Sequence, residues 1–340
     1  MDKKIIFAVA GSGKTTYIVE SINEEDRFLV ITYTVNNLRN ISASIKRKFG
    51  YFPQNIEIYT YFKFLYSFCF APFLAYELDA RGLFLDFPPR NTLKFRRTDP
   101  RYYQTTDGKL FKNRLAKLLE VKDVIPEIIK RLEKYYDYLY IDEVQDFGGH
   151  DFNFLESILQ TSVGVLMVGD FYQHTFDTSR DAKINEGLHD DYISYISRFQ
   201  KIGIQFDTTT LSNSYRCSPQ ICNFITSNLG IKIESHRTDQ THVYEISDYD
   251  NAKKIFSDNS IIKLFYQRSD KYLGFTRNWG DCKGEDCYED VCVLLNATTY
   301  SLYQKRELYK SAPLTRNKLY VAFSRTRNNL YILPETLISK

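Results

Sequence analysis

The chain has 340 residues, enough for about two domains of ordinary size, and a net charge of +3 that leaves its binding partners open. No apolar run approaches the length of a membrane span, and the first strand begins too early for a signal peptide, so we expect neither a membrane protein nor a secreted one. Six cysteines without a compact paired framework favour a reducing compartment, the cytoplasm, and their spacing does not match an ordinary zinc or iron–sulfur site.

The first predicted element is a short apolar strand at residues 5–7. A glycine-rich segment follows at 8–16, and then a helix whose apolar residues begin at Tyr17. Strand, glycine-rich turn and helix form the context of a phosphate-binding loop. Backbone N–H groups would face the phosphates, Lys14 would reach the β- and γ-phosphates, and Thr15 would ligate Mg²⁺. The first glycine of the motif is replaced by Ala8. A small-residue turn without a ligand is the alternative.

Two further strands are predicted at residues 27–34 and 56–59, and each has a Thr-Tyr pair at its carboxyl end. These pairs are Thr32-Tyr33 and Thr60-Tyr61. Because ligands of open α/β sheets bind at the carboxyl ends of strands, the hydroxyls could contact phosphates and the rings could stack on bases. Threonine and tyrosine are also good strand residues, so a purely structural role is equally compatible with the pattern.

Residues 65–115 begin with an aromatic run of helical character and continue with basic residues between aromatic ones. Single-stranded nucleic acid is bound by such a combination of cations and rings. A solvated basic face on an ordinary insertion is the alternative, which this segment taken alone slightly favours. The basic and aromatic residues are Arg90, Lys94, Arg96, Arg97, Arg101, Tyr102, Tyr103, Lys109, Lys112 and Arg114.

Residues 116–136 are predicted to be helical, with Pro126 as a break or a helix start. An apolar strand at 138–141 then leads to Asp142 and Glu143. After a strand, an adjacent acidic pair suits the second half of a nucleoside triphosphatase site. Asp142 would hold Mg²⁺ and Glu143 would polarise the attacking water as general base. Another helix and a buried strand at 163–168 lead to Gln173, which is suited to sensing a γ-phosphate.

In this order the segments resemble the motifs of superfamily 1 helicases of the UvrD/Rep/PcrA type, over nearly the whole chain. The first four matching segments are Ala10-Gly11-Ser12-Gly13-Lys14-Thr15-Thr16, Thr32-Tyr33-Thr34, Thr60-Tyr61-Phe62-Lys63-Phe64 and Ile141-Asp142-Glu143-Val144-Gln145-Asp146. The last four are Gly169-Asp170-Phe171-Tyr172-Gln173, Asn213-Ser214-Tyr215-Arg216, Lys283-Gly284-Glu285 and residues 319–327.

The resemblance implies a role for each matching residue. Arg216 and Arg325 would act as arginine fingers on the γ-phosphate, and Gln173 would report that phosphate. Tyr215 would pack against the nucleotide base, and Gly284 with Glu285 would lie at the ribose. Residues implied to contact the bound strand are Thr32, Tyr33, Thr60, Tyr61 and Phe176, the last as a substitute for the family's base-stacking tryptophan.

The sequence also departs from the family. The helix that carries an adenine-reading glutamine is missing before the first strand, which leaves the choice between ATP and GTP open. Phe62 stands where the family usually has histidine. The stretch between Arg216 and Lys283 is too short for the large accessory domain of full-length relatives, so the resemblance is to a short form.

We therefore predict an α/β chain of two RecA-like P-loop domains with mostly parallel sheets, residues 1–205 with a small helical insertion at about 65–115, and residues 206–340. The predicted activity is hydrolysis of ATP with Mg²⁺, coupled to movement on single-stranded DNA, 3′ to 5′ by resemblance, with RNA not excluded. One alternative is an ATPase subunit of a repair or defence complex, partnered for example by a nuclease, with little unwinding activity alone. A catalytically dead nucleic-acid binder and a small-molecule kinase fit the later motifs less well.

Overall fold

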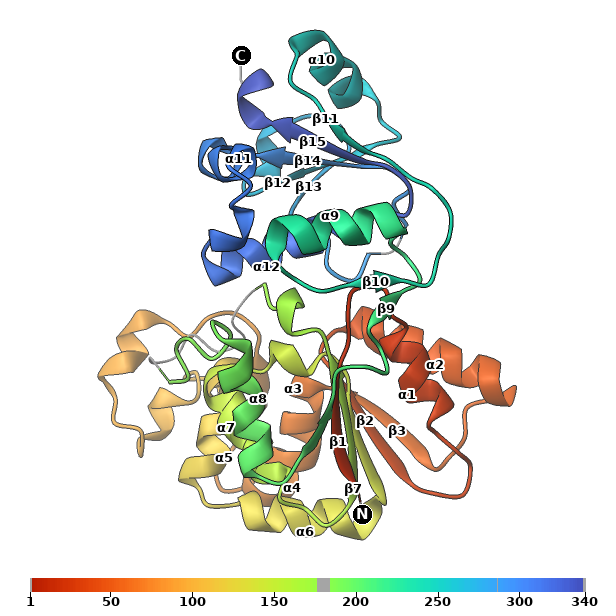
Figure 1. Cartoon of the computed structure of the whole chain (residues 1–340). Helices are drawn as coiled ribbons and strands as arrows, with labels where there is room; N and C mark the ends of the chain where they lie inside the picture. Colours follow the sequence, from red (N-terminus) through yellow and green to blue (C-terminus); the bar gives the residue numbers. More distant parts are fainter. Residues whose placement is uncertain (1, 176–183, 286, 339–340) are drawn as a thin grey trace. The chain divides into compact units, whose positions relative to one another are not determined.

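The structure is a computed structural model that describes residues 2–175, 184–285 and 287–338. The chain divides into two compact units (Figure 1). Unit 1 comprises Met1–Ile6, Thr15–Gly169 and Asp177–Asp207, and unit 2 comprises Phe7–Lys14, Asp170–Phe176 and Thr208–Lys340. Two short segments from earlier in the sequence therefore group with residues 208–340.

Unit 1 is built on a six-stranded sheet with the strand order β3-β2-β6-β7-β1-β8. The pairs β2–β3, β2–β6, β6–β7 and β1–β8 are parallel. Every residue of β2 and β7 is buried, as expected for parallel strands that are covered on both faces. The strands are β1 (Lys3–Phe7), β2 (Phe28–Thr32), β3 (Ile56–Thr60), β6 (Tyr138–Ile141), β7 (Gly164–Gly169) and β8 (Gln205–Asp207).

Helices cover both faces of this sheet, with α1 and α2 on one side and α3, α5, α7 and α8 on the other (Figure 1). The Nζ of Lys48 in α2 donates to the carbonyl oxygens of Val19, Glu20 and Ile22 at the end of α1, at 2.8–3.0 Å. These bonds help to satisfy the carbonyl groups at the end of the helix. The helices are α1 (Lys14–Glu20), α2 (Val35–Phe49), α3 (Tyr61–Lys63), a π-helix (Phe64–Phe70), α5 (Leu115–Val121), α6 (Ile125–Tyr135), α7 (Gly149–Ile158) and α8 (Tyr192–Lys201).

The predicted insertion has its own small core around Arg114, which is only 2% exposed. The Arg114 guanidinium lies 4.0 Å from the centroid of the Tyr102 ring and donates to Thr92 Oγ1 at 2.8 Å. Tyr103 is buried as well. These three residues therefore serve packing and do not belong to a solvated basic face. The elements are α4 (Ala71–Leu74), β4 (Gly82–Phe84), β5 (Lys109–Phe111) and the 3₁₀ turns Arg90–Lys94, Pro100–Tyr102 and Lys112–Arg114.

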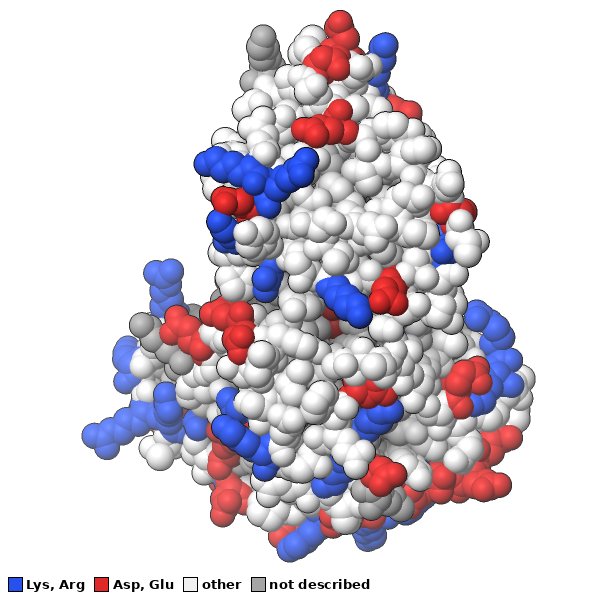
Figure 2. Space-filling model, in the orientation of Figure 1, with Lys and Arg blue, Asp and Glu red and all other residues white. Residues whose placement is uncertain are grey.

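Most of the remaining basic residues of the insertion are exposed, and Lys112 is half-buried. Figure 2 shows lysine and arginine side chains projecting from the margin of unit 1 where the insertion lies, whereas charges of both signs are interspersed over much of this face of the molecule. The exposed basic residues are Arg81, Arg90, Lys94, Arg96, Arg97, Arg101 and Lys109.

Unit 2 contains a five-stranded parallel sheet with the order β11-β15-β14-β12-β13. Alternate residues of β14 enter two cores: Val291, Val293 and Leu295 pack with α9 and α12, and Cys292 and Leu294 pack with α10. The strands are β9 (Asn213–Ser214), β10 (Glu234–Ser235), β11 (Val243–Glu245), β12 (Ile262–Phe265), β13 (Thr276–Asn278), β14 (Val291–Leu295) and β15 (Leu330–Pro334). The helices are α9 (Pro219–Leu229), α10 (Tyr249–Ser257), α11 (Ala297–Gln304) and α12 (Pro313–Phe323).

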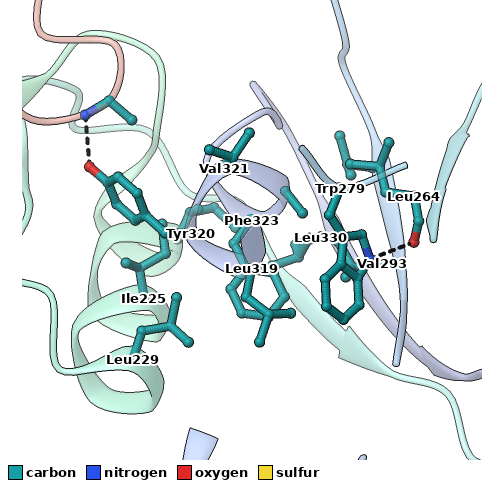
Figure 3. Packing of buried hydrophobic residues seen from close by; sticks show 14 of the residues in the cluster. Ile225, Leu229, Leu264, Trp279, Val293, Leu319, Tyr320, Val321, Phe323 and Leu330 are labelled. Atoms are coloured by element: carbon teal, nitrogen blue, oxygen red, sulfur yellow. Dashed lines mark hydrogen bonds between the residues drawn. The ribbon is translucent and has the colours of Figure 1, made fainter. Parts of the chain in front are cut away.

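Trp279 is fully buried in the larger of these cores, and its indole Nε1 donates to Leu264 O at 2.9 Å (Figure 3). The predicted α/β class with mostly parallel sheets is confirmed by both units. Among the residues described, no helix is both long and apolar enough to cross a membrane. The described residues also contain no group of three or more His, Cys, Asp or Glu side chains that could hold a metal ion.

Candidate nucleotide site

The candidate phosphate loop connects β1 to α1, which begins at Lys14. Gly11 and Gly13 have φ angles of +70° and +86°, in the left-handed region that glycine enters without steric cost. The Val9 N–H donates to Leu211 O at 2.9 Å, so the start of the loop is held by a later part of unit 2. Thr15 is half-buried and Thr16 exposed, both in the first turn of α1.

Gly11 is the point where the loop meets the Tyr215-Arg216 segment. The Tyr215 N–H donates to Gly11 O at 2.9 Å. A Cβ atom on Gly11 would lie 2.7 Å from Arg216 Cβ and 2.8 Å from Ser214 Oγ. Ser214 is fully buried, and its Oγ accepts hydrogen bonds from the N–H groups of Arg216 at 3.2 Å and Cys217 at 3.0 Å. The close approach of these two backbones therefore requires glycine in the loop.

A buried hydroxyl joins the loop to two other segments of unit 2. Tyr320 OH accepts from the Ala10 N–H at 2.8 Å and donates to Asp170 Oδ2 at 3.0 Å. Gln173 Nε2 donates to the same carboxylate oxygen at 2.9 Å. Burial, and then the Asp170 carboxylate, raise the pKa of Tyr320 well above its usual value, so the hydroxyl stays protonated. In Figure 3 a dashed line from the Tyr320 hydroxyl marks its hydrogen bond with a backbone nitrogen.

The two arginines of interest occupy different environments. Arg216 is partly exposed, and its Nη1 donates to Ser324 O at 3.1 Å. Arg325 is only 1% exposed, and its guanidinium donates to Glu285 O at 3.0 Å and to Val321 O at 3.3 Å. The structure thus places Arg216 beside the glycine loop and Arg325 against the segment that carries Glu285.

Gly284 and Glu285 lie in a turn before β14. Gly284 is exposed, with a φ of +83° and open space around its Cα. A Glu285 carboxylate oxygen accepts from Tyr288 OH, and the other lies 3.9 Å from Arg277 Nε. Burial, and then the hydrogen bond to Glu285, raise the pKa of Tyr288 above its usual value. The Glu285 side chain is thereby held within unit 2.

The acidic pair follows β6 in unit 1. Asp142 is 2% exposed, and its Oδ2 accepts from Thr32 Oγ1 at 3.3 Å. Glu143 has a φ of +56°, an uncommon backbone conformation for a residue with a side chain. Its carboxylate accepts from Gln145 Nε2, and Gln145 is fully buried. An orienting hydrogen bond and a strained backbone are both typical of functional positions.

Gly169, at the end of β7, makes room for this turn. A Cβ atom at Gly169 would lie 2.4 Å from Gln145 Oε1 and 2.7 Å from Val144 Cγ1. Residues Val144–Asp146, a 3₁₀ turn, can therefore pack against the strand only because position 169 has no side chain.

Thr32 and Thr60 are paired residues at the ends of β2 and β3. Tyr33, half-buried, packs on the Tyr61 ring with a centroid separation of 6.4 Å. Tyr61 is only 1% exposed, and its OH donates to Asp151 Oδ1 at 3.0 Å. The Tyr61 ring is therefore enclosed in unit 1, whereas part of Tyr33 reaches solvent. Phe176, the other predicted strand contact, lies outside the described residues.

Within unit 2 the structure brings together Ala10, Gly11, Gln173, Tyr215 and Arg216, and within unit 1 it joins Thr32 to Asp142. Sequence reasoning assigned no role to Asp170 and Tyr320, which link these segments. A tyrosine within the apolar run at residues 319–323, the last part of α12, was the available signal, since a buried hydroxyl needs a partner. That partner could not be chosen from sequence, because Tyr320 lies 150 residues from Asp170 and 310 from Ala10.

No known protein family and no curated protein matches this sequence. Solved structures do match. The structure of PRRSV helicase aligns with a TM-score of 0.50 at 14% identity, over 98% of this chain and 52% of that one. Arterivirus nonstructural protein 10 (helicase), in a complex with DNA, aligns with a TM-score of 0.50 at 15% identity, over 98% of this chain and 61% of that one.

The likeness establishes the fold. The chain has the α/β architecture of these viral helicases, with RecA-like P-loop folds. It spans about half to three fifths of the length of the two matched chains. At this level of identity the resemblance specifically to the UvrD/Rep/PcrA type remains a prediction from the motifs.

Proposed function

We propose that this chain is an ATP-dependent superfamily 1 helicase or translocase that acts on single-stranded DNA. The observation that carries the proposal is the bonding of the glycine loop to two other motif segments of unit 2. Gly11 O accepts from the Tyr215 N–H, and the Ala10 N–H donates to Tyr320 OH, which in turn donates to Asp170. A loop whose backbone is tied to sensing residues suits coupling between nucleotide binding and conformation.

The residues of the loop fit a nucleoside triphosphate. Gly11 and Gly13 leave the backbone without side chains where phosphate oxygens would approach, and Lys14 supplies a cation. Ser12 Oγ is buried and has no hydrogen-bond partner of its own among the described residues. The hydroxyl of Thr15 and the carboxylate of Asp142 are the hard oxygen ligands that Mg²⁺ prefers, and bound Mg²⁺ would neutralise charge on the phosphates.

Each charged or polar residue then has a role in hydrolysis. Glu143, oriented by Gln145, accepts the proton of the attacking water. Gln173 and Arg216 stabilise charge on the γ-phosphate. We assign the first contact to Arg216, because Arg325 must release Glu285 O and Val321 O before its guanidinium can act as a second finger. Glu285 would meet the ribose and Tyr215 the base.

The ends of β2 and β3 supply the proposed nucleic-acid contact. Thr32, Tyr33 and Thr60 lie there together, as expected for ligands at the carboxyl ends of parallel strands. Movement 3′ to 5′ follows from the family resemblance. The exposed basic residues of the insertion would add attraction to phosphates that weakens with salt.

A second candidate function is an ATPase subunit that needs a partner, for example a nuclease, for unwinding. The described residues between Arg216 and Lys283 form α9, β10, β11, α10, β12 and β13, which are elements of unit 2 itself. The large accessory domain of full-length relatives is therefore not inserted at this position. Translocation on single strands without separation of a tailed duplex would favour this candidate.

The test is ATP turnover with and without single-stranded DNA, single-stranded RNA and duplex. We expect strong stimulation by single-stranded DNA and a loss of at least about 100-fold in Lys14→Ala. Glu143→Gln should bind ATP yet turn over about 100-fold more slowly or worse. Lys253→Ala, an exposed lysine on α10, is the matched control and should behave as wild type. Turnover by Lys14→Ala at the wild-type rate would refute the proposal.

A further inference from the structure

The ring of His236 covers one face of the Tyr215 ring. The Tyr215 and His236 rings are stacked, with centroids 4.0 Å apart and an interplanar angle of 16°. Tyr215 is nevertheless 64% exposed. A large exposed ring that is stacked on one side has a fixed orientation and presents its remaining surface to solvent. The arrangement is unusual for a surface tyrosine that serves packing alone, because packing buries the ring.

The backbone fixes both rings. The Tyr215 N–H donates to Gly11 O at 2.9 Å, and the His236 N–H donates to Ser214 O at 2.9 Å. The short parallel pair β9–β10 sets this register, with Ser235 opposite Ser214. The Tyr215 ring therefore cannot shift along the strand without breaking its contact to the glycine loop.

The neighbours of His236 support the same segment. Ser235 Oγ donates to Cys217 O at 2.7 Å, and Arg237 Nη1 donates to Arg216 O. Each of the residues 235–237 thus contacts one of the residues 215–217. Arg237 also donates to Arg327 O and is paired with Asp239, so its guanidinium is held in place. The segment is a support for the two residues that the proposed function places on the nucleotide.

We infer that His236 is a positioning residue, which holds the Tyr215 ring in the orientation that the proposed base contact requires. This inference rests on the proposed function, which places Tyr215 at the base, and adds the residue that fixes the ring. Stacking uses the π-face that every base has, so the exposed face of the Tyr215 ring accepts adenine and guanine alike. It contributes nothing to ligands that have phosphates but no base.

The experiment compares His236→Ala, His236→Phe and His242→Ala in the whole chain. His242 is an exposed histidine of the same unit whose ring is tilted by 40° against Tyr244 at 5.6 Å, which makes it a matched control. Calorimetry measures binding of ATP, GTP and inorganic tripolyphosphate, and thermal denaturation measures folding. Steady-state kinetics give KM and kcat for ATP.

We expect His236→Ala to weaken binding of ATP and GTP about threefold to tenfold, the range for loss of one aromatic contact. KM should rise by a similar factor with kcat little changed, and tripolyphosphate binding should stay at the wild-type level. His236→Phe keeps the stack and should restore most of the affinity. His242→Ala should match wild type throughout.

Two results would overturn the inference alone: wild-type ATP affinity in His236→Ala, or equal weakening of ATP and tripolyphosphate, which would indicate a distorted loop. A wild-type chain that binds no nucleoside triphosphate would overturn the proposed function as well. The two failures are therefore distinguishable in one set of measurements.

Discussion

Gly11 shows at the scale of a single residue how backbone geometry shapes the candidate site. Its φ of +70° is one constraint, and the 2.7 Å that would separate an added Cβ from Arg216 Cβ is a second. Gly50 shares only the first constraint, since its φ is +82° and no atom lies within 4 Å of the added Cβ. Comparison of the two positions separates conformational strain from steric contact.

We expect Gly50→Ala to cost about 1 kcal/mol of unfolding free energy, the strain of a left-handed alanine. Gly11→Ala should cost at least about 2 kcal/mol and should also impair ATP binding, because the loop must move away from Arg216. Chemical denaturation and calorimetry measure the two effects. Equal costs at the two positions would contradict the close approach.

At the scale of elements, an ion pair clamps the starts of β2 and β6. The Arg27 guanidinium donates to Asp137 at 2.8 and 3.0 Å, and the Arg27 N–H donates to the same carboxylate at 2.9 Å. These hydrogen bonds lower the pKa of Asp137 to about 2. The carboxylate therefore stabilises the fold above its unfolded-state pKa, and this contribution disappears as the pH falls towards 2.

Asp137→Asn should accordingly lower the unfolding free energy at pH 7 by about 1 kcal/mol or less, since solvent screens a pair at this surface position. The difference from wild type should shrink at pH 3. Denaturation with urea at pH 7, 5 and 3 measures it. Asp107→Asn, which removes another ion-paired carboxylate in an exposed loop outside the six-stranded sheet, serves as the control. A difference that grew on acidification would contradict the assignment.

The elements also show what could be predicted from sequence. Apolar runs between turns correctly predicted β1, β2, β3, β6 and β7, because parallel strands buried on both faces read as continuous apolar segments. The positions of Thr32, Thr60 and Asp142 at strand ends could be predicted from these strands. The burial of Arg114 in the insertion could not be predicted. A cation enters a core only when rings and carbonyl oxygens surround it, and those partners are set by tertiary structure.

The candidate site was predictable only in part for a related reason. The glycine loop with its lysine, and the acidic pair, can be recognised from sequence because each motif lies within one short stretch of the chain. The Tyr320–Asp170 bond and the stack of Tyr215 on His236 join segments far apart in sequence. The enclosed position of Arg325 likewise depends on carbonyl oxygens at residues 282–285 and cannot be read from its own motif.

At the scale of the whole molecule, unit 2 includes residues 7–14 and 170–176, two short segments that precede its main part, residues 208–340. Ala10 is fully buried in the core of unit 2, next to α12 residues such as Tyr320. A fragment of residues 208–340 would lack both partners of the Tyr320 hydroxyl. Burying this hydroxyl without a partner would cost about 1–3 kcal/mol, so α12 should open more readily.

We expect amide hydrogen exchange in α12 to be at least about tenfold faster in that fragment than in the whole chain. Strands β12 and β14, whose neighbours are retained, provide the internal control and should stay protected to a similar degree. Equal protection of α12 in both proteins would show that the two early segments are dispensable for unit 2.

The 310-residue separation between Ala10 and Tyr320 also has a consequence for biosynthesis. At translation rates of about 5–20 residues per second, roughly 15–60 seconds pass between the emergence of these two residues from the ribosome. The glycine loop therefore cannot form its hydrogen bond to Tyr320 until the 310 residues after Ala10 have been synthesised. Nascent chains stalled before Tyr320 would therefore lack the hydrogen bond that the Ala10 N–H donates in the folded chain.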